Sequence, residues 1–440
     1  MPSPDLSLYH GSTPLANKVA GHQNVMSDES GSLVIKPALP REIAFYHMLG
    51  SAPRSSALAQ LKPFVAQFYG TLRLEGQLDG LGGISKEGIK VGEVPESIVL
   101  ENLAHNYTRP CVLDAKLGTE LHAPDASEEK RARMEKQARE TTSHATGLRL
   151  TGCQIWHAPT SSYILTPKSY GKSLTPSSLP AGIIRFFPLP TDKLASLVLP
   201  LSPSSDNAST PSTGGGVSHL PLTPADPASL EKLTAPGPSG SSEKVPGPDS
   251  PTEPVEYTSH AIPPALLLRL LSAIDGKMAE LEHVISRLEA RFIGASALLV
   301  YEGDPERLED ALNRYDERQK ALSVAAQGRG PGQSVKDADL EGDDEEEEEE
   351  EEEEDDELED DYDSSTSSDD DSQDGQRADA RRARRCPPFT LKMIDFAHTR
   401  LVQGEGRDEG VLLGLRTLRG LIQGRIGQVN ADMGRQGASP

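Results

Sequence analysis

The sequence has few cysteines and no long apolar run. Its three cysteines form neither a C-x-x-C pair nor a closely spaced ladder, which argues against structural zinc and disulfide bonds and fits a reducing compartment. No apolar run approaches the length of about 18 residues that a membrane-spanning helix needs. The first ten residues also lack the basic and then apolar pattern of a signal peptide. We therefore expect a soluble intracellular protein without a transmembrane segment.

Basic residues are scarce relative to acidic ones, but the imbalance lies in one segment. The chain of 440 residues has 68 acidic and 44 basic residues and a formal net charge of −24. Residues 341–374 hold 24 of the acidic residues and no lysine or arginine, so the rest of the chain is formally neutral. Without a basic surplus, we expect no direct binding to nucleic acid. The neutral remainder is long enough for two lobes around a sizeable core.

Two internal segments contain too few large apolar residues to fold. Residues 202–259 are rich in Ser, Pro, Gly and Thr, and residues 328–387 combine the acidic run with the basic patch Arg381–Arg385. Such segments cannot bury enough apolar area to offset the entropy lost on ordering, so we predict two disordered inserts. The ends of the chain, residues 1–15 and 428–440, are also predicted to be disordered. The predicted folded parts are residues 16–110, 111–201, 260–327 and 388–427.

Apolar periodicity and helix or strand start signals predict a mixture of helices and strands. Strands are expected at residues 19–23 and 32–36, which would form a hairpin, and at 97–103, 148–157, 162–166, 296–303 and 389–396. Helices are expected at residues 40–49, 125–142, 177–187, 304–327 and 408–423. One more long helix is expected, because apolar residues recur at steps of three and four from Leu267 to Phe292.

An acid and a lysine stand two residues apart in the segment PCVLDAKLG, residues 110–118. Side chains two residues apart on a strand point to the same face, so Asp114 and Lys116 would project together while the other face is apolar. A carboxylate beside an ammonium group suits phosphoryl transfer, which needs positive charge near the moving phosphoryl group and a positioned acceptor hydroxyl. Most such pairs are solvated surface charges, so the rest of the sequence must decide between the two interpretations.

Two further segments carry charges where a kinase needs them. Lys36 ends the apolar run LVIK and precedes a predicted helix that contains Glu42. In protein kinases a strand lysine contacts the nucleotide phosphates, and a helix glutamate pairs with it. Far downstream, Asp395 follows the apolar run LKMI and precedes Phe396 and Ala397. An acid at that point resembles the aspartate that holds Mg²⁺ in kinase-like folds.

These segments, in this order, resemble the inositol polyphosphate kinase family. The matches are VAGHQ at 19–23 with the Lys36 and Glu42 segments, the P-x-x-x-D-x-K-x-G signature at 110–118, and KMIDFAHT at 392–399. The later sequence GEGRDEGVLLGL is most similar to the multikinase branch of the family. The resemblance implies an α+β, two-lobed kinase-like fold, with a small β-rich N-terminal lobe and a larger α+β C-terminal lobe. It covers about residues 15–195, 261–302 and 388–427.

The resemblance also implies which residues bind ATP and Mg²⁺. Lys36 would contact the ATP phosphates, and Asp395 would hold the Mg²⁺ ion. Glu101 and Leu103 would contact the adenine at the hinge between the lobes. Asp114 would lie on the nucleotide side, near the ribose or the attacking hydroxyl.

The expected catalytic residues are Asp114, Lys116 and Asp395. By resemblance, Lys116 reaches toward the transferred phosphoryl group and the substrate. Whether Asp114 acts as a general base stays open, because a loose phosphoryl-transfer transition state asks little of a base.

Basic side chains after the signature are the main candidates for substrate binding. A substrate with several phosphates needs several cations at different angles. The multikinase branch carries substrate-binding residues on the helix after the signature, and the segment YGKSL resembles a family segment in which a basic residue meets phosphate. A solvated helix with ion pairs, a surface lysine and a merely structural histidine are the alternative interpretations. The expected substrate-binding residues are Lys116, Lys130, Arg133, Lys136, Gln137, Lys172 and His398.

The expected function is that of a monomeric, ATP-dependent inositol polyphosphate kinase. It would use Mg²⁺ and phosphorylate inositol tris- and tetrakisphosphates to give the pentakisphosphate. An inositol hexakisphosphate kinase or an inositol trisphosphate 3-kinase is the alternative within the family. Only about 30 residues separate Gly118 from the strand at Leu148. This short connection argues against the 3-kinases, which add a substrate-gripping domain there.

An alternative of another class is a non-catalytic scaffold of a nuclear transcription complex. The acidic run would then bind basic nuclear proteins or transcription factors. Arg381–Arg385 would act as a nuclear-import patch or fold back onto the acidic residues. These two segments lead us to expect the protein in the nucleus and the cytoplasm.

Overall fold

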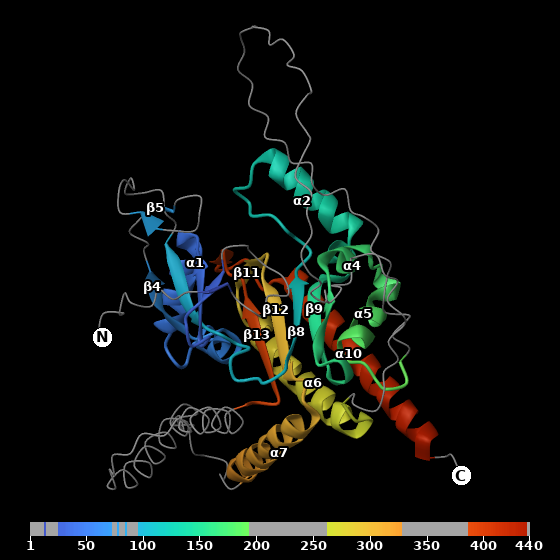
Figure 1. Ribbon diagram of the computed structural model, residues 1–440. Coiled ribbons are helices and arrows are strands. Elements are labelled where there is room, and N and C mark those ends of the chain that lie inside the picture. The colour runs from blue at the N-terminus through green and yellow to red at the C-terminus, as the bar shows by residue number, and fades with distance from the viewer. Residues whose placement is uncertain are drawn as a thin grey trace, which may run out of the picture. The chain divides into compact units, whose positions relative to one another are not determined.

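The computed structural model describes residues 13–14, 25–72, 77–78, 84–85, 96–192, 262–327 and 386–437. They belong to one compact unit, formed by residues 1–192 and 257–440, whereas a second unit, residues 193–256, lies outside the described residues. The described part contains two five-stranded antiparallel sheets with helices packed on them (Figure 1). This α+β architecture with two main sheets confirms the predicted two-lobed fold. None of the described helices is long and apolar enough to cross a membrane.

The N-terminal sheet has the strand order β1-β2-β3-β7-β4. Its strands are β1 (Thr13–Pro14), β2 (Met26–Ser27), β3 (Leu33–Pro37), β4 (Phe68–Leu72) and β7 (Ser97–Glu101). The other elements of this part are helix α1 (Pro40–Gly50), the 3₁₀ helix η2 (Ala59–Phe64) and the short pair β5 (Gln77–Leu78) and β6 (Ile84–Ser85). Helix α1 begins with a proline, which has no backbone N–H to leave unpaired in the first turn. The ring of Phe45 on α1 stacks on Phe396 at 4.4 Å, so this helix is fixed against the segment that carries Asp395.

The C-terminal sheet has the strand order β10-β9-β8-β12-β13. Its strands are β8 (Pro110–Leu117), β9 (Leu148–His157), β10 (Ser162–Thr166), β12 (Ser296–Glu302) and β13 (Phe389–Ile394). Strands β11 (Ala290–Ile293) and β14 (His398–Leu401) form a separate antiparallel pair. On β8, Leu113, Ala115 and Leu117 are fully buried in the main core, so the alternate positions Asp114 and Lys116 face the other way.

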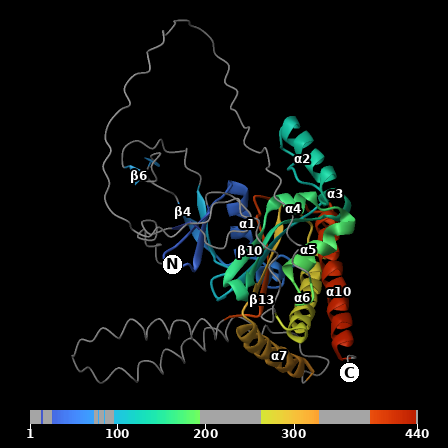
Figure 2. The same ribbon diagram turned by 45° about the vertical axis from the view of Figure 1, so that its right-hand side comes forward.

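Helices cover the core face of the C-terminal sheet. The helices and 3₁₀ helices of this part are α2 (Glu128–Glu140), α3 (Ser143–Thr146), η3 (Ala158–Thr160), α4 (Lys168–Ser173), η4 (Pro176–Ser178), α5 (Leu179–Phe186), α6 (Pro264–Ser286), α7 (Pro305–Gln327) and α10 (Glu409–Gly437). Helices α6 and α10 lie side by side in both ribbon views (Figures 1 and 2). Buried leucines from both helices, such as Leu270 and Leu415, join Leu113 in one core.

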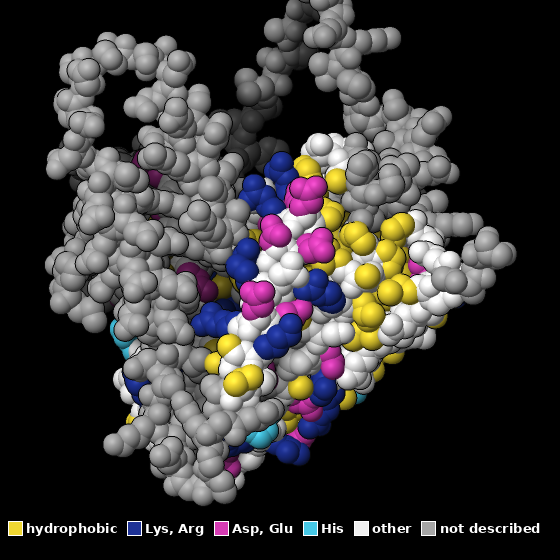
Figure 3. All heavy atoms as spheres, turned by 90° about the horizontal axis from the view of Figure 1, so that it is seen from below, with side chains coloured by type: hydrophobic (Ala, Val, Ile, Leu, Met, Phe, Trp, Pro, Cys, Tyr) yellow, Lys and Arg dark blue, Asp and Glu magenta, His cyan; other side chains and the backbone are white. Residues whose placement is uncertain are grey.

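Helix α7 is a solvated helix that docks through a narrow apolar stripe. Leu308, Ala311 and Leu312 are buried, whereas most of its charged side chains are exposed. Seen from below, acidic and basic side chains alternate over this part of the surface (Figure 3). Because neither sign dominates, this face does not form a single-sign patch for a charged partner.

Several predicted elements have the expected bounds. Strands β9 and β10 coincide with the predicted segments, and α1 ends one residue later than expected. Strand β3 pairs with β2, whereas the predicted hairpin partner at 19–23 lies outside the described residues. Both predicted inserts also lie outside them, except for residues 386 and 387.

Two predicted helix ends were wrong. Helix α6 stops at Ser286, and the last residue of its predicted apolar series, Phe292, lies in β11 after the chain turns at Arg287. Helix α10 continues past residue 423 to Gly437, so residues 428–437, which we predicted to be disordered, are helical. The extension is held because Val429 is fully buried in the core and Arg425 bonds to the α5–Asp192 segment.

Candidate functional site

Three charged side chains from separate segments meet in one cluster. The Lys36 Nζ on β3 lies 2.9 Å from Glu42 Oε1 on α1 and 2.6 Å from Asp395 Oδ1 after β13. The same Glu42 oxygen accepts the backbone N–H of Phe396 at 3.2 Å. Burial lowers the pKa of Lys36, but the carboxylates of Asp395 and Glu42 outweigh it, so the net shift is upward and the lysine stays charged. The structure therefore brings together the lysine, the glutamate and the aspartate that the sequence singled out.

The backbone at Asp395 is what turns its carboxylate toward Lys36. Asp395 has φ of +66°, in the left-handed region that few residues other than glycine adopt. Aspartate tolerates this region better than most side chains. The turn separates β13 from β14 and places the carboxylate at the edge of a cavity. Strain held at this position is consistent with a functional role.

A cavity of about 350 Å³ opens beside Asp395. It is lined by residues of β8, β9, β12, α2 and α4. Its charged lining residues are four cations and two carboxylates: Lys116, Arg149, Lys168, Lys172, Asp114 and Asp395. A cavity with surplus positive charge suits a ligand that carries several negative charges.

The pairing of β8 with β9 contains an irregularity at the cavity. Asp114 pairs with Gly152, but the next residue, Ala115, pairs with Leu150, so Thr151 is left over as a bulge residue. Bulges of this kind re-aim side chains and are frequent beside active sites. Beyond the bulge Lys116 pairs with Arg149, which places two cations side by side on neighbouring strands.

Asp114 is buried next to the cavity. Burial raises its pKa, and the nearby negative charge of Asp395 adds to that rise. Lys116 and a hydrogen bond from the Ser296 hydroxyl act in the opposite direction without cancelling it. The Oδ1 atom of Asp114 has no hydrogen-bond partner within the described residues. A buried carboxylate oxygen without a donor is costly, and a bound ligand can supply the donor.

Lys116 is held by a backbone carbonyl. Its Nζ donates a hydrogen bond to Gly294 O at 2.6 Å. Burial lowers its pKa, the positive charges of Arg149 and Lys168 add to this effect, and the carboxylates of Asp395 and Asp114 offset part of it. The expected pairing of Asp114 and Lys116 on one face is therefore confirmed, with a further cation beside them.

Helix α4 presents two lysines to the cavity. Lys168 and Lys172 are spaced i, i+4 and both line it. The helix can lie against β9 only because residue 171 is glycine: a Cβ there would come within 1.7 Å of the Leu150 carbonyl oxygen. Lys172 was predicted from the sequence. Lys168 was not, although its spacing from Lys172 was a usable signal.

Helix α2 contributes Gln137 to the cavity lining. Its N-cap is Ser127, whose hydroxyl accepts the Lys130 N–H. Lys130, Arg133 and Lys136 are exposed on the same helix, and Lys136 pairs with Glu140 at 3.7 Å. None of these three predicted substrate-binding residues lines the cavity.

His398 on β14 lies near cations from three other elements. Burial lowers its pKa, and the charges of Lys130, Arg41 and Lys116 lower it further, whereas Asp125 acts in the opposite direction. Asp125 itself forms an ion pair with Arg41 at 3.1 Å. The predicted substrate-binding residues Lys130 and His398 are therefore close enough to interact electrostatically.

Of the two predicted adenine-contacting residues, Glu101 is the last residue of β7 and Leu103 follows two residues later. The backbone N–H of Glu101 bonds to Gln67 O, and its side chain lies 3.9 Å from Lys392 Nζ. Leu103 is partly buried against the main core. Strand β7 is the direct neighbour of β3, which carries Lys36. Neither Glu101 nor Leu103 lines the cavity at Asp395.

Sequence reasoning missed three further polar lining residues, Arg149, Thr151 and Ser296. Arg149 and Thr151 are polar positions inside β9, a strand whose residues, Arg149 included, are mostly buried. That alternation was visible in LRLTG and could have flagged them. Ser296 pairs with Lys116 across β12 and β8, a register that no local pattern reveals.

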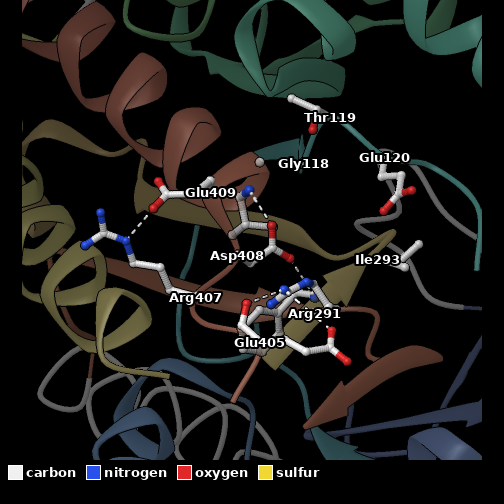
Figure 4. Close-up of a pocket in the computed structure, with 12 residues that line it drawn as sticks. Gly118, Thr119, Glu120, Arg291, Ile293, Glu405, Arg407, Asp408 and Glu409 are labelled. Carbon is white, nitrogen blue, oxygen red and sulfur yellow. Dashed lines mark hydrogen bonds and ion pairs between the residues drawn. The ribbon is translucent and has the colours of Figure 1, made fainter. Parts of the chain in front are cut away.

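A second hollow, of about 380 Å³, lies at the start of α10 (Figure 4). The carboxylate of Asp408 joins the elements around it by accepting the N–H of Val411 and the N–H of Phe292, each at 3.0 Å. The Arg291 guanidinium donates to the carbonyls of Glu405 and Gly406. Because these polar groups satisfy one another, we interpret this hollow as a structural junction.

The residues at the cavity fit a divalent cation that is shared with phosphate. Among the described residues, no group of three or more His, Cys, Asp or Glu side chains could hold a metal by itself. Mg²⁺ is usually bound through one or two carboxylates together with phosphate oxygens and water. Asp395 offers such a carboxylate, 28% exposed at the cavity, and nearby Asp114 Oδ1 has no hydrogen-bond partner in the described ranges.

Comparisons with known proteins agree with one another. A family model described as inositol polyphosphate kinase matches residues 97–199 and 261–423. An inositol polyphosphate multikinase of Schizosaccharomyces pombe is 32% identical over 171 residues, which are 39% of this chain and 61% of that protein. An inositol hexakisphosphate kinase 3 of Mus musculus is 36% identical over 104 residues, 24% of this chain and 26% of that protein.

A solved structure is also similar. It is the inositol phosphate multikinase of S. cerevisiae in complex with ADP and Mn²⁺, with 20% sequence identity and a TM-score of 0.47 over 90% of this chain and 100% of that chain. The sequence matches span less than two thirds of the length of these curated relatives.

Proposed function

The chain belongs to the inositol polyphosphate kinase family, since the family model matches more than half of its residues, and on this premise we propose that it transfers the γ-phosphoryl group of ATP to a hydroxyl of an inositol polyphosphate. The main support is a single juxtaposition. The ion-paired cluster of Lys36, Glu42 and Asp395 lies at the edge of a cavity lined by four cations and by Asp114.

On the nucleotide side, Lys36 binds ATP phosphates. Glu42 and Asp395 fix its ammonium group, so little side-chain entropy is lost when a phosphate arrives. Asp395 holds Mg²⁺, which when bound neutralises charge on the phosphoryl oxygens. The resemblance also favours Glu101 and Leu103 as adenine contacts, because β7 runs beside β3.

Asp114, which the resemblance puts on the nucleotide side near the attacking hydroxyl, accepts a hydrogen bond from that hydroxyl of the acceptor. Its Oδ1 atom accepts no hydrogen bond from the part of the chain that the structure describes, and Ser296 holds the carboxylate in place. Lys116 places positive charge beside that hydroxyl. A loose transition state needs orientation more than a strong base, so positioning by Asp114 is sufficient.

The lining cations favour an acceptor with several phosphates. Lys116, Lys168 and Lys172 approach the cavity from a strand and a helix, so they can contact phosphates at different angles. We propose inositol tris- and tetrakisphosphates as acceptors and the pentakisphosphate as product. The similarity to an inositol hexakisphosphate kinase makes the hexakisphosphate the second candidate acceptor.

The test is a product assay with labelled ATP, Mg²⁺ and inositol tris-, tetrakis-, pentakis- and hexakisphosphates, run beside Asp395→Asn. Asparagine also tolerates a positive φ, so the variant should fold and serve as a specific control. We expect conversion of the tris- and tetrakisphosphates to the pentakisphosphate, reduced at least about 100-fold in the variant. Turnover of the hexakisphosphate alone would favour the second candidate, and turnover of none would refute the kinase proposal.

We also propose that the protein has nuclear and cytoplasmic pools and that residues 341–374 bind basic nuclear proteins. The support is the sequence alone: 24 acidic residues in one run, followed by the basic patch Arg381–Arg385. Deletion of residues 341–374 should abolish binding to a basic partner such as a histone and leave the kinase activity unchanged. Retained histone binding by the deletion variant would refute this assignment.

A further inference from the structure

Arg185 is a buried arginine that is held by uncharged groups. It lies in the last turn of α5, and only 8% of the residue is exposed. Its Nε atom donates a hydrogen bond to the Thr166 hydroxyl at 2.6 Å, and its guanidinium carbon lies 4.9 Å from the centre of the Tyr170 ring. Its Nη1 atom has no hydrogen-bond partner within the described residues. Burying a charge among uncharged groups is expensive, so the position needs a reason.

Arg425 shows how the same fold treats a buried arginine with a structural task. It is 3% exposed, and its Nε and Nη2 atoms donate to Phe187 O at 3.0 and 2.8 Å. Its Nη1 atom donates to Gln428 at 2.8 Å, and Asp192 supplies the countercharge. At similar burial, Arg185 has neither a carboxylate at ion-pair distance nor a partner for Nη1 in the part of the chain that the structure describes.

The contacts of Arg185 hold the start and the middle of α4. Thr166 is the last residue of β10, and Pro167, the N-cap residue of α4, follows it directly. Tyr170 lies within α4 and packs against the main core. Helices α4 and α5 lie side by side in both ribbon views (Figures 1 and 2). A helix of six residues is too short to be stable by itself, so its tertiary contacts decide where it lies.

The two lysines of α4 lie on the opposite side of this helix from Tyr170. Successive residues of an α-helix are rotated by about 100°, so Tyr170 is about 200° away from Lys168 and from Lys172. These two lysines line the cavity, whereas the Tyr170 ring is turned to Arg185 and the core. A shift of α4 at Tyr170 therefore moves both lysines at the cavity.

Two glycines let α4 and α5 approach the same residue of β9. A Cβ at Gly171 of α4 would come within 1.7 Å of the Leu150 carbonyl oxygen, and a Cβ at Gly182 of α5 within 2.2 Å of Leu150 Cδ1. Gly182 lies three residues before Arg185, so both are on one face of α5. The close approach of α5 to β9 thus brings the Arg185 guanidinium within reach of α4.

We propose that Arg185 is a positioning residue for the acceptor, because it holds Thr166 and Tyr170 and so fixes where Lys168 and Lys172 lie at the cavity. This inference rests on the proposed function for the identity of the acceptor. Arg185 itself is not among the residues that line the cavity, so it acts through α4. An arginine suits this task, since its planar group donates hydrogen bonds in its plane and stacks on a ring with its face.

The first test compares three variants of the full chain. Arg185→Met removes the charge at similar length, and Arg185→Lys keeps the charge without the planar group. Arg109→Met is the matched control, because the exposed Arg109 also lies over an aromatic ring of β9, that of Trp156 at 4.3 Å, but does not contact α4. Steady-state kinetics measure kcat and the KM values for inositol tetrakisphosphate and ATP, and thermal unfolding measures Tm.

We expect Arg185→Met to raise the KM for inositol tetrakisphosphate by about 10-fold, since charged hydrogen bonds from the displaced lysines are weakened. The KM for ATP and the kcat at saturating acceptor should stay unchanged. Arg185→Lys should recover part of the loss, because a cation still lies over Tyr170. Arg109→Met should match the wild type in all three kinetic constants.

A pair of variants at Tyr170 tests the same contact from α4 and decides the question even if Arg185→Met does not fold. Tyr170→Phe keeps the aromatic ring and should match the wild type. Tyr170→Leu removes the ring and should raise the KM for inositol tetrakisphosphate by about 3- to 10-fold, the range of a partly buried cation–π contact. Equal KM values in the two variants would overturn the inference.

A double-mutant cycle tests whether Arg185 acts through the lysines of α4. In a chain that carries Lys168→Met and Lys172→Met, adding Arg185→Met should raise the KM for inositol tetrakisphosphate no further, because the groups that it positions are gone. A further rise by the same factor as in the wild-type background would show that Arg185 acts by another route and would overturn the inference.

Other outcomes separate this inference from the proposed function. A lower Tm with an unchanged KM for inositol tetrakisphosphate in Arg185→Met would make Arg185 a structural residue and overturn the inference alone. Equal increases in the KM values for inositol tetrakisphosphate and ATP would indicate a general distortion and also overturn it. Wild-type protein that binds ADP but phosphorylates no inositol polyphosphate would overturn the proposed function, and the inference with it.

Discussion

The two sides of the candidate site balance their charges in opposite ways. On the nucleotide side, Lys36 is within 2.9 Å of Glu42 and 2.6 Å of Asp395, so the fold supplies both partners. On the acceptor side, four cations face Asp114, and buried atoms of Arg149 and Asp114 have no hydrogen-bond partner among the described residues. The first side is complete before any ligand binds, whereas the second is completed by the ligand. Substitutions should therefore cost stability on the first side and ligand affinity on the second.

The largest effect on stability is expected from Glu42→Gln. Glu42 is 1% exposed and accepts from both Lys36 and the Phe396 N–H, so the change removes a buried countercharge and weakens the link between α1 and the Asp395 turn. We expect the free energy of unfolding to fall by about 3 kcal/mol, the cost of breaking a buried ion pair. Urea denaturation measures this change.

Glu140→Gln is the matched control on the surface. Its carboxylate is 63% exposed and pairs with Lys136 at 3.7 Å. An exposed pair of this kind contributes about 0.5 kcal/mol or less. Equal losses of unfolding free energy in Glu42→Gln and Glu140→Gln would mean that the stability of the fold does not depend on the buried ion pairs of the nucleotide side. The expected difference between the two sides would then be wrong.

A smaller loss of stability, with a specific loss of acceptor binding, is expected from Gly171→Ala. The new Cβ would stand 1.7 Å from the Leu150 carbonyl, so α4 must shift away from β9 and take Lys168 and Lys172 with it. We expect a loss of about 2 kcal/mol in the free energy of unfolding. The KM for the inositol phosphate should rise by about 10-fold or more, as charged hydrogen bonds are lost, with the KM for ATP unchanged.

Gly276→Ala tests whether the effect comes from the clash. Gly276 lies inside α6, and a Cβ there would meet no atom of the described residues within 4 Å. Alanine in a helix interior is favoured over glycine by about 0.5–1 kcal/mol, so this variant should be more stable than the wild type. A Gly171→Ala variant with wild-type stability and an unchanged KM for the inositol phosphate would show that the placement of α4 does not set acceptor affinity.

The sequence predicted the cluster of Lys36, Glu42 and Asp395 better than the lining of the cavity, for a physical reason. Lys36, Glu42 and Asp395 each stand in a local pattern of strand end, helix start or apolar run, and the fold brings these patterns together. Arg149 depends on the register of β9 against β8, which shifts at the bulge beside Asp114. A one-residue shift in register decides which side chains share a face, and the spacing of residues along a single strand does not reveal that shift.

The length of α10 shows the same limit. Helix α10 contains seven glycines, among them Gly420, Gly424, Gly427 and Gly434, and glycine argues against a helix on intrinsic propensity. The helix continues because Ile422 and Val429 are fully buried and Arg425 bonds to Phe187 and Gln428. The contact with Phe187 is to a residue far away in the sequence, and the contact with Gln428 forms only within an existing helix. Packing therefore overrides helix propensity here.

The smallest effect is expected at His398, which tests where the acceptor side ends. Its pKa lies below 6.5 because of burial and the cations Lys130, Arg41 and Lys116, so it is neutral in the free protein at pH 7.5. A bound polyphosphate would favour the charged form and raise this pKa, so binding would take up a proton and strengthen as the pH falls toward 6. The phosphates of the ligand titrate in the same range, so only the difference between wild type and His398→Gln is informative.

Between pH 7.5 and pH 6, the affinity of the wild type for inositol tetrakisphosphate should rise a few-fold more than that of His398→Gln. This difference corresponds to the uptake of up to about one proton by His398 on binding. The same lowered pKa makes the folded protein bind fewer protons than the unfolded chain, so the His398 contribution to stability is present above pH 6.5 and decreases as the pH falls through it. Parallel affinity profiles would leave the acceptor side to Asp114, Lys116 and the β9–α4 cations. Affinity profiles that diverge would extend the acceptor side to His398 on β14 and to Lys130 on α2. The charge of Lys130, which lowers the pKa of His398, would then belong to the same phosphate-binding surface.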